Sequence, residues 1–204
     1  MSLSLDRLRD KLLSEAPSLP LEPRRSDYDL DPEHRPPRPA VLTPAAVLVP
    51  IVQRAVPAVL FTERSPSLAR HAGQVSFPGG RTHPDDESLV RTALRETQEE
   101  IGIDPEFVSV VGFLDPYETG TGFAILPVVG VLREGFALVP DTNEVAEIFE
   151  VPLAFLLDPA SREKNRMEWR GRMRSYYVFR YNGHTIWGAT AAMLVNFAER
   201  WNAA

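Results

Sequence analysis

Cysteine is absent from the 204 residues of this sequence, so disulfide bonds and thiolate metal sites are excluded. A reducing compartment fits that composition. The sequence also lacks an apolar run of the roughly 20 residues that a membrane-spanning helix needs. Its first 13 residues carry charges inside their apolar run, which is not the pattern of a signal peptide. We therefore expect a cytoplasmic protein without a membrane partner.

An excess of positive charge is missing too, since the formal net charge is −6 at pH 7. This balance argues against general nucleic-acid binding. An anionic substrate would consequently need a metal ion or a local basic patch. The sequence contains one run of basic residues. Such runs are usually solvated strand faces, but this run would meet nucleotide phosphates if it lined a cleft. It consists of Arg162, Lys164, Arg166, Arg170, Arg172 and Arg174.

The first 40 residues differ in character from the rest of the chain. Leucines at helical spacing, among them Leu8 and Leu12, predict a short amphipathic helix over residues 3–15. Seven prolines between residues 17 and 40 disfavour helix and most sheet pairing, which predicts an extended surface segment. We interpret residues 1–40 as an arm that packs on the domain or on a partner chain, as in a homodimer.

We expect residues 41–204 to form one domain of mixed strands and helices. Apolar runs bounded by turn residues predict strands at 46–53, 58–64, 74–77, 107–114, 123–132 and 144–151. A hairpin is expected within 166–188, with turns near Gly171 and Asn182-Gly183. Helices are predicted at 86–101, 152–158 and 189–201. This combination favours an α/β sandwich around a mixed sheet.

The helix expected at 86–101 carries three glutamates on one face. At roughly 100° per residue, Glu96, Glu99 and Glu100 lie within about 100° of one another. Neighbouring carboxylates repel unless a cation sits among them, and their hard oxygens suit magnesium or manganese. Gly79 and Gly80 precede the helix, and glycine lets the backbone come close to a ligand. An acidic helix face alone is usually solvated, but this combination predicts metal-assisted chemistry on a phosphate.

The same stretch, residues 79–103, resembles the Nudix box. The matching positions are Arg95, Glu96, Glu99, Glu100, Gly102 and Ile103. Thr97 replaces an aliphatic residue of the pattern, and the loop is one residue longer than usual. Either Asp86 or Glu87 therefore stands for the first glutamate of the box. The resemblance implies a Nudix-type α/β/α sandwich and a hydrolase that depends on Mg²⁺ or Mn²⁺.

The resemblance also implies roles for individual residues. Glu96 and Glu100, at positions i and i+4, would grip one metal ion, while Glu99 would be a third ligand or the base that activates water. The identity of that base stays open. Arg95 would complete the catalytic set by orienting the earlier acid. Nudix enzymes often take a further acidic ligand from a later segment, and Glu144 is the candidate here, preferred to the glutamate three residues on.

Upstream, residues 60–80 resemble the signature of coenzyme A pyrophosphatases, a Nudix subgroup. The matches are Leu60, Thr62, Arg64, Ser65, Leu68, His71, Gly73, Val75, Phe77, Pro78, Gly79 and Gly80. Phe61 and Ala69 depart from the signature, and Arg70 follows one place after the arginine it expects. The resemblance implies that the substrate is bound by Arg64, Arg70, His71, Gly79 and Gly80.

The implied activity is hydrolysis of the diphosphate linkage of coenzyme A or its derivatives, giving 4′-phosphopantetheine and adenosine 3′,5′-bisphosphate. The partner would then be a small-molecule nucleotide. Two alternatives stay open. The enzyme could act on another nucleoside diphosphate derivative, such as ADP-ribose or an oxidised nucleotide. The chain could also be a non-catalytic nucleotide-binding module, against which the intact set of glutamates argues.

Overall fold

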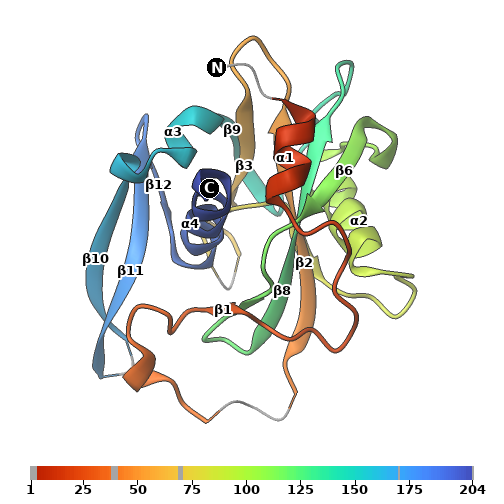
Figure 1. Cartoon of the computed structure of the whole chain (residues 1–204). Coiled ribbons are helices and arrows are strands. Elements are labelled where there is room, and N and C mark those ends of the chain that lie inside the picture. Colours follow the sequence, from red (N-terminus) through yellow and green to blue (C-terminus); the bar gives the residue numbers. More distant parts are fainter. Residues whose placement is uncertain (1–3, 38–40, 69–70, 170, 204) are drawn as a thin grey trace.

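A mixed sheet of nine strands forms the centre of the protein in the computed structural model, which describes residues 4–37, 41–68, 71–169 and 171–203. Helix α2 (Leu89–Ile101) packs on one face of this sheet and helix α4 (Gly188–Asn202) packs on the other (Figure 1). A second sheet of three strands lies on the outer side of α4. The α/β sandwich around a mixed sheet is therefore confirmed.

The strands of the large sheet follow the apolar runs of the sequence. They are β1 (Arg25–Ser26), β2 (Thr43–Val52), β3 (Ala58–Arg64), β4 (Val75–Ser76), β5 (Gly79–Arg81), β6 (Val108–Phe113), β7 (Tyr117–Glu118), β8 (Phe123–Leu132) and β9 (Val145–Pro152). Strand β2 runs parallel to β8 and antiparallel to β3, and β9 pairs with β3 at the edge. The remaining elements are β10 (Arg162–Trp169), β11 (Arg172–Tyr181), β12 (His184–Trp187), α1 (Leu5–Lys11) and α3 (Leu153–Leu157).

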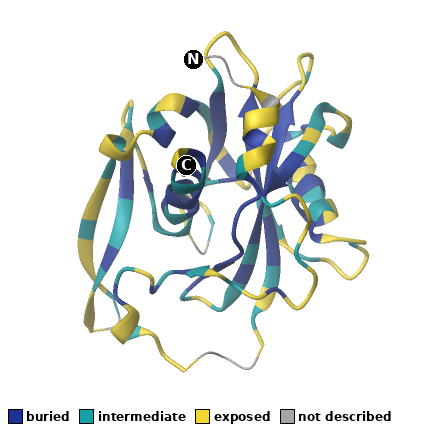
Figure 2. Cartoon of the chain, in the orientation of Figure 1, coloured by how far each residue is buried: buried dark blue, intermediate teal, exposed yellow. Residues whose placement is uncertain are grey.

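Burial on both faces explains the continuous apolar run in β2. Its neighbours in the sheet satisfy the backbone, and the two helices cover both faces, so neither face needs polar side chains. Leu48 belongs to the apolar cluster under α2, and Val49 belongs to the cluster under α4. Both side chains are fully buried. Figure 2 shows that the buried residues gather in the central strands of the large sheet.

Local sequence signals fix both ends of α2. The Ser88 side chain accepts a hydrogen bond from the backbone N–H of the third following residue and caps the start. Gly102 ends the helix in the left-handed conformation, with φ of 76°. Between these ends, Leu89, Ala93 and Ile101 are buried at helical spacing. This apolar face sets the rotation of the helix and therefore the direction of its glutamates.

The described part of the N-terminal arm packs on the domain. Leu8 and Leu12 are buried in the same apolar cluster as α4, and Leu13 bridges to Phe113 of β6. The proline-rich segment joins the large sheet through the two residues of β1, which pair in parallel with β7. Among the described residues, no helix combines the length and the apolar character needed to cross a membrane.

Candidate active site

The two glycines of β5 lie directly against the glutamates of α2. The Gly79 N–H donates a hydrogen bond to the Glu100 carboxylate, with 3.1 Å between nitrogen and oxygen. A Cβ atom added at Gly80 would lie only 2.5 Å from Oε2 of Glu96. Glu96 therefore touches the backbone of β5 because Gly80 has no side chain in the way, and Glu100 is held there by the Gly79 N–H.

Burial makes the charges at this site unfavourable. Burial raises the pKa of Glu100 to about 8, the Gly79 N–H and Arg64 lower it in part, and the nearby Glu96 and Glu144 raise it further. Burial also raises the pKa of Glu96, which Arg95 lowers in part. A bound divalent cation would offset this accumulation of negative charge, and carboxylate oxygens are its preferred ligands. The donor set therefore fits such an ion.

Arg95 organises the acidic side chains of the box. Its Nε and Nη2 atoms each lie 3.0 Å from one oxygen of Asp86, which forms a bidentate ion pair. The guanidinium holds the pKa of Asp86 well below its usual range. Asp86 rather than Glu87 is thus the partner of Arg95, which settles the choice that the sequence left open. The Nη1 atom of Arg95 also donates to Glu96 and Glu99, each at 2.9 Å.

This network separates the three box glutamates. Arg95 draws Glu96 and Glu99 toward itself, while Glu100 points to the backbone of β5. Among the described residues, oxygens of these glutamates do not gather as a three-ligand group within 4.8 Å. The Glu99 side chain is 60% exposed, so it is free to turn. A shared cation would require Glu96 and Glu99 to rotate away from the guanidinium.

Arg64, a predicted substrate residue, also lies beside these glutamates. Its Nη1 atom is 3.8 Å from Oε1 of Glu100. Its Nε atom is buried and has no hydrogen-bond partner among the described residues. A buried N–H without a partner is unfavourable, so this atom has an unused capacity to bind an acceptor.

His71, another predicted substrate residue, is less closely tied to the box glutamates. Exposed His71 has a positive φ of 58°, and its Nδ1 atom lies 2.8 Å from the amide oxygen of Gln74. Arg70 lies outside the described residues. Gly79 and Gly80 belong to β5 and lie directly against Glu100 and Glu96.

A β-bulge in β9 decides which later glutamate approaches the box. Val145 opposes Arg64 and Glu147 opposes Glu63, so Ala146 is an extra residue between the two pairs. Val145 packs with residues of α2, whereas Glu147 lies on the other face of the sheet, near β12. Glu144, just before the strand, is close enough to raise the pKa values of the buried box glutamates. The structure thus places Glu144 beside the box and Glu147 away from it.

Arg170 of the basic run lies outside the described residues. The rest of the run lies in the hairpin of β10 and β11, on the far side of α4 from α2 (Figure 1). It therefore does not line the site at the box. Arg174 instead lies over the rings of Tyr28 and Trp169, at 5.1 and 4.9 Å from their centres.

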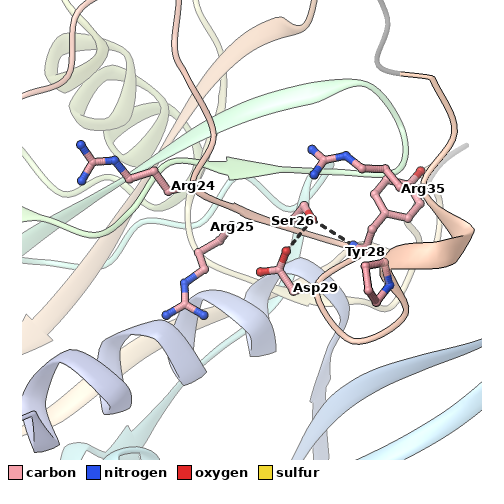
Figure 3. A pocket seen from close by; sticks show the side chains of 7 residues that line it. Arg24, Arg25, Ser26, Tyr28, Asp29 and Arg35 are labelled. Atoms are coloured by element: carbon pink, nitrogen blue, oxygen red, sulfur yellow. Dashed lines mark hydrogen bonds between the residues drawn. The ribbon is translucent and has the colours of Figure 1, made fainter.

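A separate arginine-lined pocket lies at the arm (Figure 3). Arg24, Arg25 and Arg35 surround it, and each has an acidic partner elsewhere in the fold. Arg25 lies 2.8 Å from Glu199, and Arg35 donates to Glu118. The arginines of the pocket are therefore engaged in ion pairs, although Asp115 is also bound by Arg200 and Glu199 also lies near Arg162.

Comparison with known proteins agrees with the site. The model of the NUDIX domain family matches residues 42–170. A protein named "Uncharacterized Nudix hydrolase NudL" from Photorhabdus laumondii subsp. laumondii is 42% identical over 156 residues, which cover 76% of this chain and 83% of that protein. The protein of the same name from Pectobacterium atrosepticum is 43% identical over 159 residues, covering 76% and 80%. A family match of this length, with relatives this similar, shows that the chain belongs to the Nudix family and is a pyrophosphatase of a class that generally depends on a divalent metal.

Proposed function

We propose that this Nudix hydrolase cleaves the diphosphate linkage of coenzyme A or its derivatives, giving 4′-phosphopantetheine and adenosine 3′,5′-bisphosphate. The observation that carries the proposal is the segment 60–80, which resembles the coenzyme A pyrophosphatase signature and leads directly into β5. A substrate of this length needs contacts beyond its diphosphate. The segment supplies Arg64 next to the box, where such a contact could form.

The ion would be Mg²⁺ or Mn²⁺, held by Glu96 and Glu100 together with Glu99 and Glu144. When bound, such an ion neutralises charge on the diphosphate and lowers the pKa of the attacking water. The chain's own contribution is to hold these carboxylates against β5 and to orient them through Arg95 and Asp86. The raised pKa of Glu100 supports this assignment because a nearby cation would favour its ionised form.

Arg64 would bind a phosphate of the nucleotide half. A guanidinium fork fits phosphate oxygens, and the Nε atom of Arg64 has no partner among the described residues. A hydrogen bond between charged groups contributes on the order of 1.5–3 kcal/mol. Its loss should lower kcat/KM by roughly tenfold to a hundredfold.

The test is to measure kcat/KM for coenzyme A, dephospho-coenzyme A and ADP-ribose, with Mg²⁺ or Mn²⁺, while identifying the products by mass. Wild type should prefer coenzyme A, and Arg64→Ala should lose activity on it. If the 3′-phosphate is the partner of Arg64, the loss on dephospho-coenzyme A should be smaller. Arg70→Ala belongs in the same panel because the signature assigns the neighbouring position to the substrate.

Arg54→Ala is the matched control. Arg54 is exposed and forms its ion pair with Glu150, at 2.6 Å, so its loss should leave kcat/KM unchanged. A wild-type preference for ADP-ribose over coenzyme A would overturn the substrate proposal. The assignment to a Nudix pyrophosphatase would stand in that case.

A further inference from the structure

A second group of metal-ligand side chains lies on the opposite face of the sheet from the Nudix box. Glu63 of β3, Glu147 of β9 and His184 of β12 each offer one ligand atom, and these atoms all lie within 4.8 Å of one another. Glu63 shares its face of β3 with Phe61, which packs in the cluster under α4. The next residue, Arg64, faces Glu100. The two sites are therefore separated by the sheet.

The imidazole of His184 is held in a defined position between the two carboxylates. Its ring stacks on Phe149 with 3.7 Å between centres and 5° between planes. Nδ1 lies 3.5 Å from Glu63 Oε2, and Nε2 lies 3.7 Å from Glu147 Oε1. Both distances exceed the roughly 2.7–3.2 Å of an ordinary hydrogen bond. The three groups are thus close without being joined by short hydrogen bonds.

The charge of the group calls for a cation. Among the described residues, His184 is the only basic side chain within 4.0 Å of the carboxylate of Glu63 or of Glu147. Two carboxylates and a neutral imidazole carry two negative charges, which one divalent ion would balance. A single imidazole with two carboxylates suits zinc, which binds nitrogen and oxygen ligands, better than an all-oxygen magnesium site.

We propose that Glu63, Glu147 and His184 form a zinc site, distinct from the metal site of the Nudix box. Ligands of one tetrahedral zinc ion lie about 3.3 Å apart. The two carboxylates lie beside different ring nitrogens, so one of them must swing toward the nitrogen that binds the ion, which closes gaps of up to about 1.5 Å. Three protein ligands leave one position for water. The ion joins β12 of the small sheet to β3 and β9 of the large sheet. It thereby acts as a structural link between the two sheets, and this role does not rest on the choice of coenzyme A as substrate.

The first test titrates the full chain with Zn²⁺ by calorimetry, with Mg²⁺ in excess to compete for the all-oxygen Nudix site. Wild type should bind one equivalent of Zn²⁺. Glu63→Gln and His184→Gln should each weaken that binding by at least about tenfold to a hundredfold. His83→Gln is the matched control, because His83 is an exposed histidine that lies 3.3 Å from the carboxylate of Asp85 in a loop. It should bind Zn²⁺ as wild type does.

A second measurement needs no variant. In nitrogen-15 spectra of the histidine rings, Zn²⁺ should shift one nitrogen of His184 and leave the other three histidines unchanged. At free Zn²⁺ about a hundred times its Kd, the Tm of wild type should rise by about 5–10 °C. No Zn²⁺ binding in excess Mg²⁺, or equal binding by wild type and His184→Gln, would overturn the proposal. The group would then be an imidazole packed between two carboxylates without a bound ion.

Discussion

Gly80→Ala tests whether the contact between β5 and α2 positions the catalytic carboxylate. The added Cβ would lie 2.5 Å from Oε2, 2.6 Å from Cδ and 2.8 Å from Oε1 of Glu96. These atoms end a flexible side chain, so Glu96 can move away. It must withdraw by about 0.9 Å to reach an ordinary contact of 3.4 Å. The substitution therefore displaces one carboxylate without a clash against the backbone.

The magnitude follows from that displacement. A shift of about 1 Å in a catalytic group lowers the rate by roughly a hundredfold, equivalent to about 2.7 kcal/mol in the barrier. The backbone at Gly80 has no positive φ, so alanine adds no strain there. Alanine also restricts the unfolded chain, which stabilises the fold by about 0.4–1 kcal/mol. We therefore expect a large loss of kcat/KM with an unchanged or slightly higher Tm.

The neighbouring glycine gives the matched comparison. A Cβ at Gly79 would lie 2.4 Å from the Ala46 carbonyl oxygen and 2.5 Å from Cα of Val47, and φ there is 149°. These are backbone atoms, so Gly79→Ala should destabilise the fold by at least about 1–3 kcal/mol. The assay combines kcat/KM on the best wild-type substrate with thermal melts. Wild-type kcat/KM in Gly80→Ala, or a Tm loss equal to that of Gly79→Ala, would refute the reasoning.

Three further predictions concern charged side chains. Glu100→Gln should abolish most turnover. Burial raises the pKa of folded Glu100 to about 8, so ionisation of this carboxyl destabilises the metal-free protein as the pH rises above about 4.3. In the presence of a chelator, the Tm of Glu100→Gln should therefore exceed that of wild type at pH 9 and equal it at pH 4. Asp86→Asn should lower kcat/KM by about tenfold by releasing Arg95, whereas Glu87→Gln should have no effect on kinetics. Burial raises the pKa of Asp115, but its arginine and asparagine partners on α4 lower it more; its stabilisation is therefore present above about pH 4 and is lost as the pH falls through the depressed folded pKa. Asp115→Asn should lower the free energy of unfolding at pH 7 and converge with wild type in acid, as denaturant titrations at both pH values would measure.

Much of the fold could be predicted because its long elements carry strong local signals. Residues 58–64 and 123–132 match β3 and β8, and the predicted helix at 86–101 starts three residues before α2. The observed helix starts later for a physical reason. Asp86 turns away to pair with Arg95, and Ser88 provides the cap. The sequence missed β1, β5 and β7, strands of two or three residues. β1 and β5 pair with strands that are distant in the sequence, and β7 is too short to carry an alternating pattern of its own.

In the candidate site too, the sequence could predict the residues that one element carries but not those whose placement depends on distant segments. The spacing of Glu96 and Glu100 was visible locally, since one helix carries both. The choice of Asp86 depended on the path of a loop, which spacing alone could not show. The group around His184 draws on three strands far apart in the sequence, so no local pattern could have indicated it.

The bulge in β9 has a consequence for how this edge strand tolerates changes in length. Ala146 has no paired position of its own in the ladder with β3. Without it, Val145 would still oppose Arg64 and Glu147 would still oppose Glu63, and the alternation of a regular strand would keep them on opposite faces. Elsewhere in β9, removing one residue would turn the following side chains to the wrong face. The edge strand thus contains one position at which the chain can lose a residue while the Nudix box and the group of Glu63, Glu147 and His184 both stay in place.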